Sequence, residues 1–149
     1  MQYWNLDPQP ANAEGGAPAP RRAQPLILVA DDNESSARAF AEFLRTRNYD
    51  VILAHDGLEA CEKTAQAKPD VILMDVEMPR LDGLEATRRI RAHPDPAVTT
   101  TPIIALTGFA TPEEADLCFE AGATCFLGKP VGLVKLIQTV ESALHLPSH

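Results

Sequence analysis

Residues that can bind a metal ion or a phosphate group recur where short apolar runs of this sequence end. Asp31 and Asp32 follow the first run, Asp75 the third, Thr107 the fourth and Lys129 the fifth. Three carboxylates at one point repel one another unless a cation joins them. Mg²⁺ suits such ligands, because it accepts one or two carboxylates and keeps sites for water and phosphate oxygens. With a lysine and a hydroxyl beside them, these residue types favour phosphoryl transfer.

The elements that must bring these residues together alternate along the chain. Five apolar runs are typical of buried strands, at residues 26–30, 51–54, 71–74, 103–106 and 125–127. Amphipathic or capped stretches predict helices at 35–47, about 57–67, from the turn at 82–83 to about 91, 111–121 and 132–144. This alternation predicts a parallel sheet with helices on both faces. In such sheets a site forms at the carboxyl ends of the strands, beside a topological switch point.

Four motifs carry a resemblance to a known family. They are VADDN at 29–33, LMDVEMPRLDG at 73–83, ALTG at 105–108 and LGKP at 127–130. In this order and spacing they closely resemble the motifs of CheY-like receiver domains, the response-regulator modules of two-component and phosphorelay systems. The resemblance runs from about residue 25 to residue 146. It implies a flavodoxin-like (βα)5 fold, an α/β architecture with strand order 2-1-3-4-5.

The resemblance also implies a role for each acidic residue of the constellation. Asp75 would be the phospho-acceptor, making the chain a phosphoprotein that carries an aspartyl phosphate. Asp32 and Asp75 would bind Mg²⁺ together with the backbone carbonyl of Glu77. Asp31 would hold a water molecule bound to the metal.

Three further positions match residues that contact or sense the phosphoryl group in this family. Thr107 and Lys129 would contact the phosphoryl oxygens. Phe126 matches the family's switch aromatic, and we expect it to turn inward when Thr107 moves toward the modified aspartate. The peptide bond between Lys129 and Pro130 would be cis, which is rare enough elsewhere to be meaningful.

The resemblance implies signalling partners. A histidine kinase or a histidine phosphotransfer protein would supply the phosphoryl group. The chain ends near its last predicted helix, leaving no length for a DNA-binding or catalytic domain. We therefore expect it to act through a downstream protein target or a homodimer, or to be an excerpt of a hybrid kinase. It is expected to be a switch and not an enzyme, beyond self-phosphotransfer and auto-dephosphorylation.

Composition excludes several other classes. The formal charge of −8 argues against sequence-independent binding to nucleic acid or to an anionic membrane. No apolar window approaches the roughly 18 residues of a membrane span, and no secretory signal is visible, so we expect a cytoplasmic protein. The three cysteines form no CxxC pair and indicate reduced thiols. The four histidines are not spaced as zinc ligands.

The first residues differ from the rest. Residues 1–24 are rich in proline, alanine and glycine and have no periodic apolar face, which predicts a disordered N-terminal tail before a receiver domain at 25–149. Tyr3, Trp4 and Leu6 are the sizeable apolar residues of this tail. They are either solvated or form a docking peptide.

Two local expectations concern the helices. Arg88, Arg89 and Arg91 are expected to form a solvated face of the third predicted helix. Gly132 is expected in the first turn of the last helix, where its cost to helix stability would be mild.

Two alternative functions would require different residues at the acidic site. A haloacid-dehalogenase-like phosphatase also uses an aspartate nucleophile and Mg²⁺, but it would want a second aspartate at position 77, which is Glu77, and a cap domain. A degenerate receiver used only for binding would lack part of the acidic cluster, all of which is present here. The sequence therefore favours a phosphorylated receiver over both.

Overall fold

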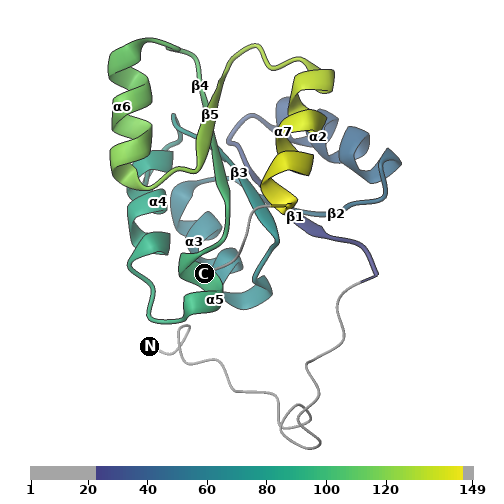
Figure 1. The fold of residues 1–149 in the computed structure, drawn as a ribbon, viewed down its shortest axis with the longest axis horizontal. Coiled ribbons are helices and arrows are strands. Elements are labelled where there is room, and N and C mark those ends of the chain that lie inside the picture. The colour runs from purple at the N-terminus through teal and green to yellow at the C-terminus, as the bar shows by residue number, and fades with distance from the viewer. Residues whose placement is uncertain (1–22, 146–149) are drawn as a thin grey trace, which may run out of the picture.

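The computed structural model describes residues 23–145, in which a parallel sheet lies between two layers of helices (Figure 1). The five strands are β1 (Leu26–Ala30), β2 (Asp50–Ala54), β3 (Val71–Asp75), β4 (Ile103–Thr107) and β5 (Cys125–Gly128). Their order is β2-β1-β3-β4-β5, which confirms the predicted topology. The sheet order reverses between β1 and β3, and this is the switch point where a site is expected. The predicted tail lies almost wholly outside the described residues.

The helices divide between the two faces of the sheet. They are α2 (Glu34–Thr46), α3 (Gly57–Ala67), α4 (Gly83–Arg91), α5 (Pro96–Thr99), α6 (Pro112–Ala121) and α7 (Leu133–Leu144). Side chains of α2 and α7 share one buried cluster with the sheet. Those of α3 and α4 share a second cluster on the other face, and α6 contributes to a third. Among residues 23–145, no helix combines the length and apolar character needed to cross a bilayer.

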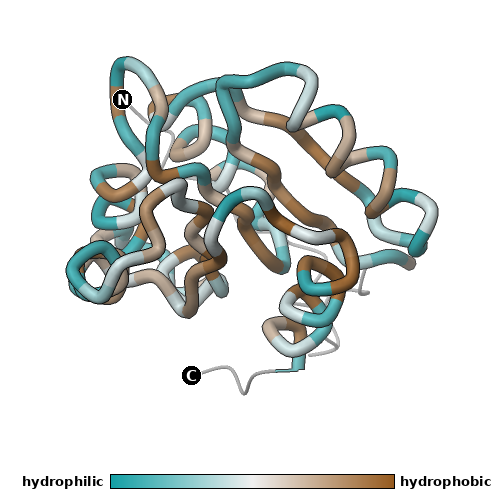
Figure 2. Tube along the Cα trace, turned by 90° about the horizontal axis from the view of Figure 1, so that it is seen from above, coloured by the Kyte–Doolittle hydropathy of each residue, from teal (hydrophilic) through white to brown (hydrophobic). Residues whose placement is uncertain are grey.

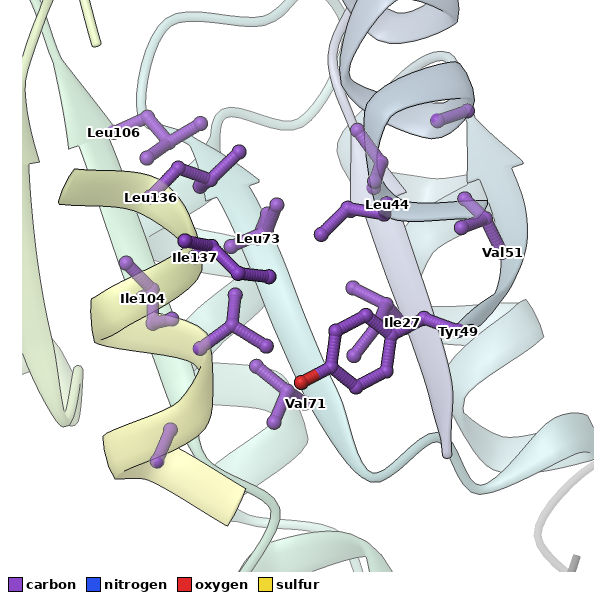
Figure 3. Close-up of a cluster of buried hydrophobic side chains, with 14 of the residues drawn as sticks. Ile27, Leu44, Tyr49, Val51, Val71, Leu73, Ile104, Leu106, Leu136 and Ile137 are labelled. Carbon is purple, nitrogen blue, oxygen red and sulfur yellow. The ribbon is translucent and has the colours of Figure 1, made fainter. Parts of the chain in front are cut away.

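The alternation of side chains along a strand builds both clusters at once. In β1, Ile27 and Val29 pack into the α2–α7 cluster, whereas Leu28 and Ala30 pack into the α3–α4 cluster. All four are completely buried, as expected for a strand covered on both faces. Figure 3 shows how the first cluster is filled from the sheet and from both helices. In Figure 2 brown, hydrophobic segments run through the middle of the molecule, and much of the teal, hydrophilic chain lies around it.

Short polar side chains start the helices that leave the carboxyl edge of the sheet. Asn33, Asp56, Asp82 and Thr111 each accept a hydrogen bond from the backbone N–H three residues later. Such caps satisfy the free N–H groups of the first turn and fix where each helix begins. They therefore also fix the loops that carry the site residues.

Two helix predictions need correction. Gly132 is not in the first turn of α7: it is the capping residue, with extended backbone angles (φ −72°, ψ 144°), and the helix begins at Leu133. The short helix α5 was not predicted, because residues 96–99 are too few to show an amphipathic period. Asp95 caps this helix and Pro96 takes its first position, where a missing N–H costs nothing.

Arg91 is the third correction, because it is not part of a solvated face. Its guanidinium donates to the carbonyl oxygens of Gly122 at 2.8 Å, Thr99 at 2.8 Å and Thr101 at 2.7 Å. The other two arginines of the predicted face remain about half-exposed and pair with a glutamate of the same helix. Arg91 instead joins the end of α4 to the end of α6 and to the segment before β4.

Candidate functional site: an acidic cluster at the switch point

Three carboxylates gather at the switch point. An oxygen from each of Asp31, Asp32 and Asp75 lies within 4.8 Å of the other two. Asp31 and Asp75 are each 2% exposed, whereas Asp32 is open to solvent. Asp75 is the last residue of β3, and the other two follow the adjacent strand β1. Hard oxygen ligands at this spacing are a donor set that fits a divalent cation such as Mg²⁺.

Lys129 completes the site from the end of β5. Its Nζ lies 2.8 Å from Oδ1 of Asp75, and the backbone N–H of Glu77 donates to the same oxygen at 3.1 Å. The Lys129–Pro130 peptide bond is cis, as the resemblance implied. The N–H of Lys129 donates to the carbonyl of Thr107 at 2.8 Å, so pairing with β4 holds the lysine backbone at this edge.

The charges of the site depend on one another. Burial raises the pKa of Asp31 to about 6; the N–H of Asn33 opposes that rise and the nearby charge of Asp75 adds to it. Burial alone would lower the pKa of Lys129. The hydrogen bond and charge of Asp75, with the charges of Asp31 and Glu77, outweigh burial and hold that pKa above its ordinary value. One lysine therefore faces an excess of carboxylates, and an added cation would relieve the remaining repulsion.

The acidic cluster opens into a cleft of about 740 Å³. Its charged lining residues are Asp31, Asp32, Asp75, Glu77 and Lys129. Its apolar lining residues include Phe40 of α2, Val131, and Leu133, the first residue of α7. A charged group entering this cleft would therefore meet the carboxylates with an apolar surface beside them.

The loop that follows Asp75 is tightly anchored. The N–H of Gly83 donates to the carbonyl of Val76 at 2.9 Å, and that of Gly57 to the carbonyl of Leu81 at 3.0 Å. A methyl group at Gly83 would lie 2.1 Å from the carbonyl oxygen of Asp75, so only glycine fits this approach. The loop that presents Glu77 is thus pinned against the first turns of α3 and α4.

Thr107 is placed differently from the residues above. It is completely buried at the end of β4, and it is not among the described residues that line the cleft. Its hydroxyl donates to Oε2 of Glu114 at 3.2 Å and accepts from the N–H of Phe109 at 3.0 Å. The structure thus brings five predicted residues to one cleft and directs the Thr107 hydroxyl toward α6.

Sequence reasoning missed Glu114. The signal that could have found it is the spacing Thr111-Pro-Glu-Glu114, which is typical of a helix start whose third residue carries a carboxylate. The pattern does not reveal that this carboxylate reaches Thr107.

Phe126 lies on β5, half-buried, beside the small cluster under α6. Its ring meets that of Phe119 edge to face, with centroids 5.9 Å apart and an interplanar angle of 80°. Phe119 is 48% exposed, so the pair lies at the surface and not in the main core. The ring therefore has a partner on α6, the helix that also carries Glu114.

A doubly wound sheet of order 2-1-3-4-5 with carboxylates and a lysine at its switch point defines a receiver-type α/β domain. The family model for the response regulator receiver domain matches residues 27–141. The chain belongs to this family, and two-component signalling is its context.

Curated and solved relatives agree with this membership. The polar-differentiation response regulator DivK of Brucella anthropi is 30% identical over 118 residues, which cover 79% of this chain and 94% of DivK. The chemotaxis protein CheY4 of Vibrio cholerae has 34% identity and a TM-score of 0.77, over 82% of this chain and 100% of that one. The receiver domain of the sensor histidine kinase PA1611 of Pseudomonas aeruginosa has 34% identity and a TM-score of 0.76, over 83% and 100%; its structure has a magnesium ion coordinated in the active site cleft.

Proposed function

We propose that this protein is a phosphorelay switch that takes a phosphoryl group onto Asp75 from a histidine kinase or a histidine phosphotransfer protein. The observation that carries the proposal is the hydrogen bond from Lys129 to Asp75 inside a cluster of three carboxylates. A lysine paired to one buried carboxylate leaves the others to attract a cation, and phosphoryl transfer needs both kinds of positive charge.

Asp32 and Asp75 would hold Mg²⁺ together with the backbone carbonyl of Glu77, and Asp31 would hold a water bound to it. The ion would neutralise charge on the phosphoryl oxygens during transfer. The magnesium described for the Pseudomonas receiver supports this assignment, as does the donor set of the cluster.

The transfer itself is a displacement at phosphorus. A carboxylate oxygen of Asp75 forms the new O–P bond while the P–N bond to the donor imidazole breaks, and the imidazole leaves with the electron pair of that bond. Lys129, released from Asp75 Oδ1, would pair with a phosphoryl oxygen, and the Thr107 hydroxyl would donate to another. Auto-dephosphorylation by water would reset the switch, so we propose no substrate turnover by this chain.

The output would be carried by protein contacts. Movement of Thr107 would free space beside β4, and Phe126 would turn inward to fill it. The altered surface on α6, β5 and α7 would then bind a downstream protein or a second copy of the chain. The acidic charge favours protein partners over nucleic acid or membrane, and we propose a cytoplasmic location.

Intact-mass measurement after treatment with acetyl phosphate and Mg²⁺ tests the acceptor. Wild type should gain one phosphoryl group, and Asp75→Asn should gain none. Asp116→Asn, which removes an exposed carboxylate on α6, is the matched control and should be labelled like wild type. Undiminished labelling of Asp75→Asn would overturn the assignment.

A further inference from the structure

The hydroxyl of Thr107 is already occupied in this structure. It has a single proton to donate, and that proton is directed to Oε2 of Glu114 at 3.2 Å. The hydroxyl oxygen of Thr107 in turn accepts from the N–H of Phe109 at 3.0 Å, and the side chain is completely buried. A donor bound in this way is not available to a new acceptor until the bond to Glu114 breaks.

Glu114 is held in place by the start of α6. The N–H of Glu114 donates to the side chain of Thr111, the capping residue, at 3.1 Å. In the common capping box the carboxylate at this third position returns to the N–H of the capping residue. Here that N–H is already used, because Thr111 donates it to the carbonyl of Phe109 at 2.8 Å. The carboxylate of Glu114 is turned instead toward the end of β4.

The neighbouring residue shows that this arrangement is specific to one glutamate. Glu113 stands in the same first turn and also places negative charge near the helix N-terminus, where such charge is favourable. Glu113 is exposed, whereas Glu114 is half-buried and reaches Thr107. Loss of either carboxylate changes the charge of the helix end equally, but only one loss frees the Thr107 hydroxyl.

We propose that Glu114 is a positioning residue that holds Thr107 in the unphosphorylated arrangement and so sets the threshold of the switch. This inference rests on the proposed phosphorylation of Asp75 and on the proposed hydrogen bond from Thr107 to the phosphoryl group. Thr107 cannot donate to Glu114 and to a phosphoryl oxygen at the same time. Glu114 therefore stabilises one of the two arrangements and not the other, which is the condition for shifting their populations.

Beryllofluoride, an analogue of the phosphoryl group, provides the test. With Mg²⁺ present, calorimetry should show that Glu114→Ala binds it about 3- to 10-fold more tightly than wild type, because a hydrogen bond to a charged group opposes binding only in wild type. Glu114→Gln keeps a neutral acceptor and should lie between the two. Glu113→Ala should bind like wild type. Equal affinities for Glu114→Ala and Glu113→Ala would overturn the proposal.

A second readout separates positioning from a general effect on the helix. In a Thr107→Val background no hydroxyl remains to be held, so adding Glu114→Ala should leave beryllofluoride affinity unchanged. An increase there as large as in the Thr107 protein would mean that Glu114 acts otherwise, and the proposal would fail. If wild type binds no beryllofluoride, the proposed function itself is wrong, and that outcome is distinct from a failure of Glu114 alone.

Discussion

On one side of Asp75, a methyl group added at Gly83 would lie 2.1 Å from the Asp75 carbonyl oxygen. On the other side, after β4, a methyl group added at Gly108 would find its nearest neighbour, the carboxylate of Glu77, 4.0 Å away. We call these the β3 side (residues 56–91) and the β4 side (residues 107–128). A side chain therefore has no room at Gly83, whereas the position of Gly108 is open. The β4 side is open at this loop only, because an added methyl group would lie 2.6 Å from Arg91 at Gly122 and 3.0 Å from Ala110 at Gly128.

The difference assigns different tasks to the two sides. The β3 side presents Asp75 and Glu77, and reactive groups must be held within a fraction of an ångström to be effective. The β4 side carries Thr107 and the half-buried Phe126, and its exposed residues include Phe109 at 61% and Phe119 at 48%. A switch needs such a region, because two arrangements must lie close in energy. Under the proposed function, Asp75 would accept the phosphoryl group on the β3 side, and Thr107 and Phe126 would respond to it on the β4 side.

The largest effect that would test this comparison is on stability. Gly83→Ala should lower the free energy of unfolding by about 3 kcal/mol or more, because the backbone must shift to admit the new methyl group. Gly108→Ala should change it by less than about 1 kcal/mol, with a gain as the expected sign, since alanine restricts the unfolded chain. Urea denaturation of the two variants measures both. Similar losses in the two would mean that the sides are equally tight.

A second stability test concerns Arg91, which contacts the end of α6 at Gly122. Arg91→Ala should cost about 2–4 kcal/mol, because it leaves the carbonyls of Gly122, Thr99 and Thr101 without their donor. Arg88→Ala, from the exposed part of the same helix, should cost less than about 0.5 kcal/mol. Thermal and urea unfolding would show the difference. A small loss in Arg91→Ala would mean that the end of α6 is not fixed through this residue.

Sequence reasoning succeeded where a pattern is local and repeated. The strands were predicted to within a residue, because each is a short apolar run and the three central strands are buried throughout. The carboxylates and Lys129 were found because parallel strands end at one edge of the sheet. This geometric rule needs no side-chain detail.

Sequence reasoning failed where a long polar side chain forms hydrogen bonds with residues that are distant in the sequence. Arg91 was predicted to be solvated because its neighbours in sequence are arginines, yet its three carbonyl acceptors lie 8 to 31 residues away. Glu114 fits a capping pattern, but its carboxylate turns to Thr107 because the expected N–H is taken by Phe109. Such choices depend on tertiary contacts that no periodicity encodes.

A smaller effect concerns how the loop after β3 is tied to the start of α3. Asp56 caps α3 and accepts from the side chain of Arg80, whose Nε lies 3.1 Å away. Burial alone would raise the pKa of Asp56, but the N–H of Glu59 and the guanidinium of Arg80 outweigh it and lower that pKa. Asp56→Ala should therefore cost about 1–2 kcal/mol at pH 7, chiefly through loss of the cap. Asp56→Asn keeps a capping oxygen and should lose less.

The pH dependence of this contribution has a definite sign. Because the folded-state pKa lies below the unfolded value of about 3.9, the charge stabilises the fold above that pH and ceases to do so as pH falls through the folded pKa. The gap in unfolding free energy between wild type and Asp56→Asn should therefore be constant near pH 7 and shrink below about pH 4. A gap that widened on acidification would contradict the lowered pKa.

The smallest effect concerns the residue that spans the two sides. The Glu77 carboxylate lies in the cleft, reaches toward Gly108 and contributes to the raised pKa of Lys129. We expect it to oppose the approach of water to a phosphoryl group on Asp75. Glu77→Gln should shorten the life of the aspartyl phosphate by about 2- to 5-fold, the size of a partly exposed charge effect. Glu113→Gln is the control, and following phosphate release gives both rates.

Phe109 should slow hydrolysis by a different cause, and salt can separate the two. Its ring is exposed on the β4 side and would limit access by bulk, so Phe109→Ala should also shorten the half-life. Added salt screens charge, so it should reduce the difference between wild type and Glu77→Gln while leaving the effect of Phe109→Ala unchanged. If Glu77→Gln with Phe109→Ala hydrolysed at the wild-type rate, neither residue would guard the site. If both effects faded with salt, Phe109 would act through the position of Glu77, and the β4 side would be coupled to the β3 side.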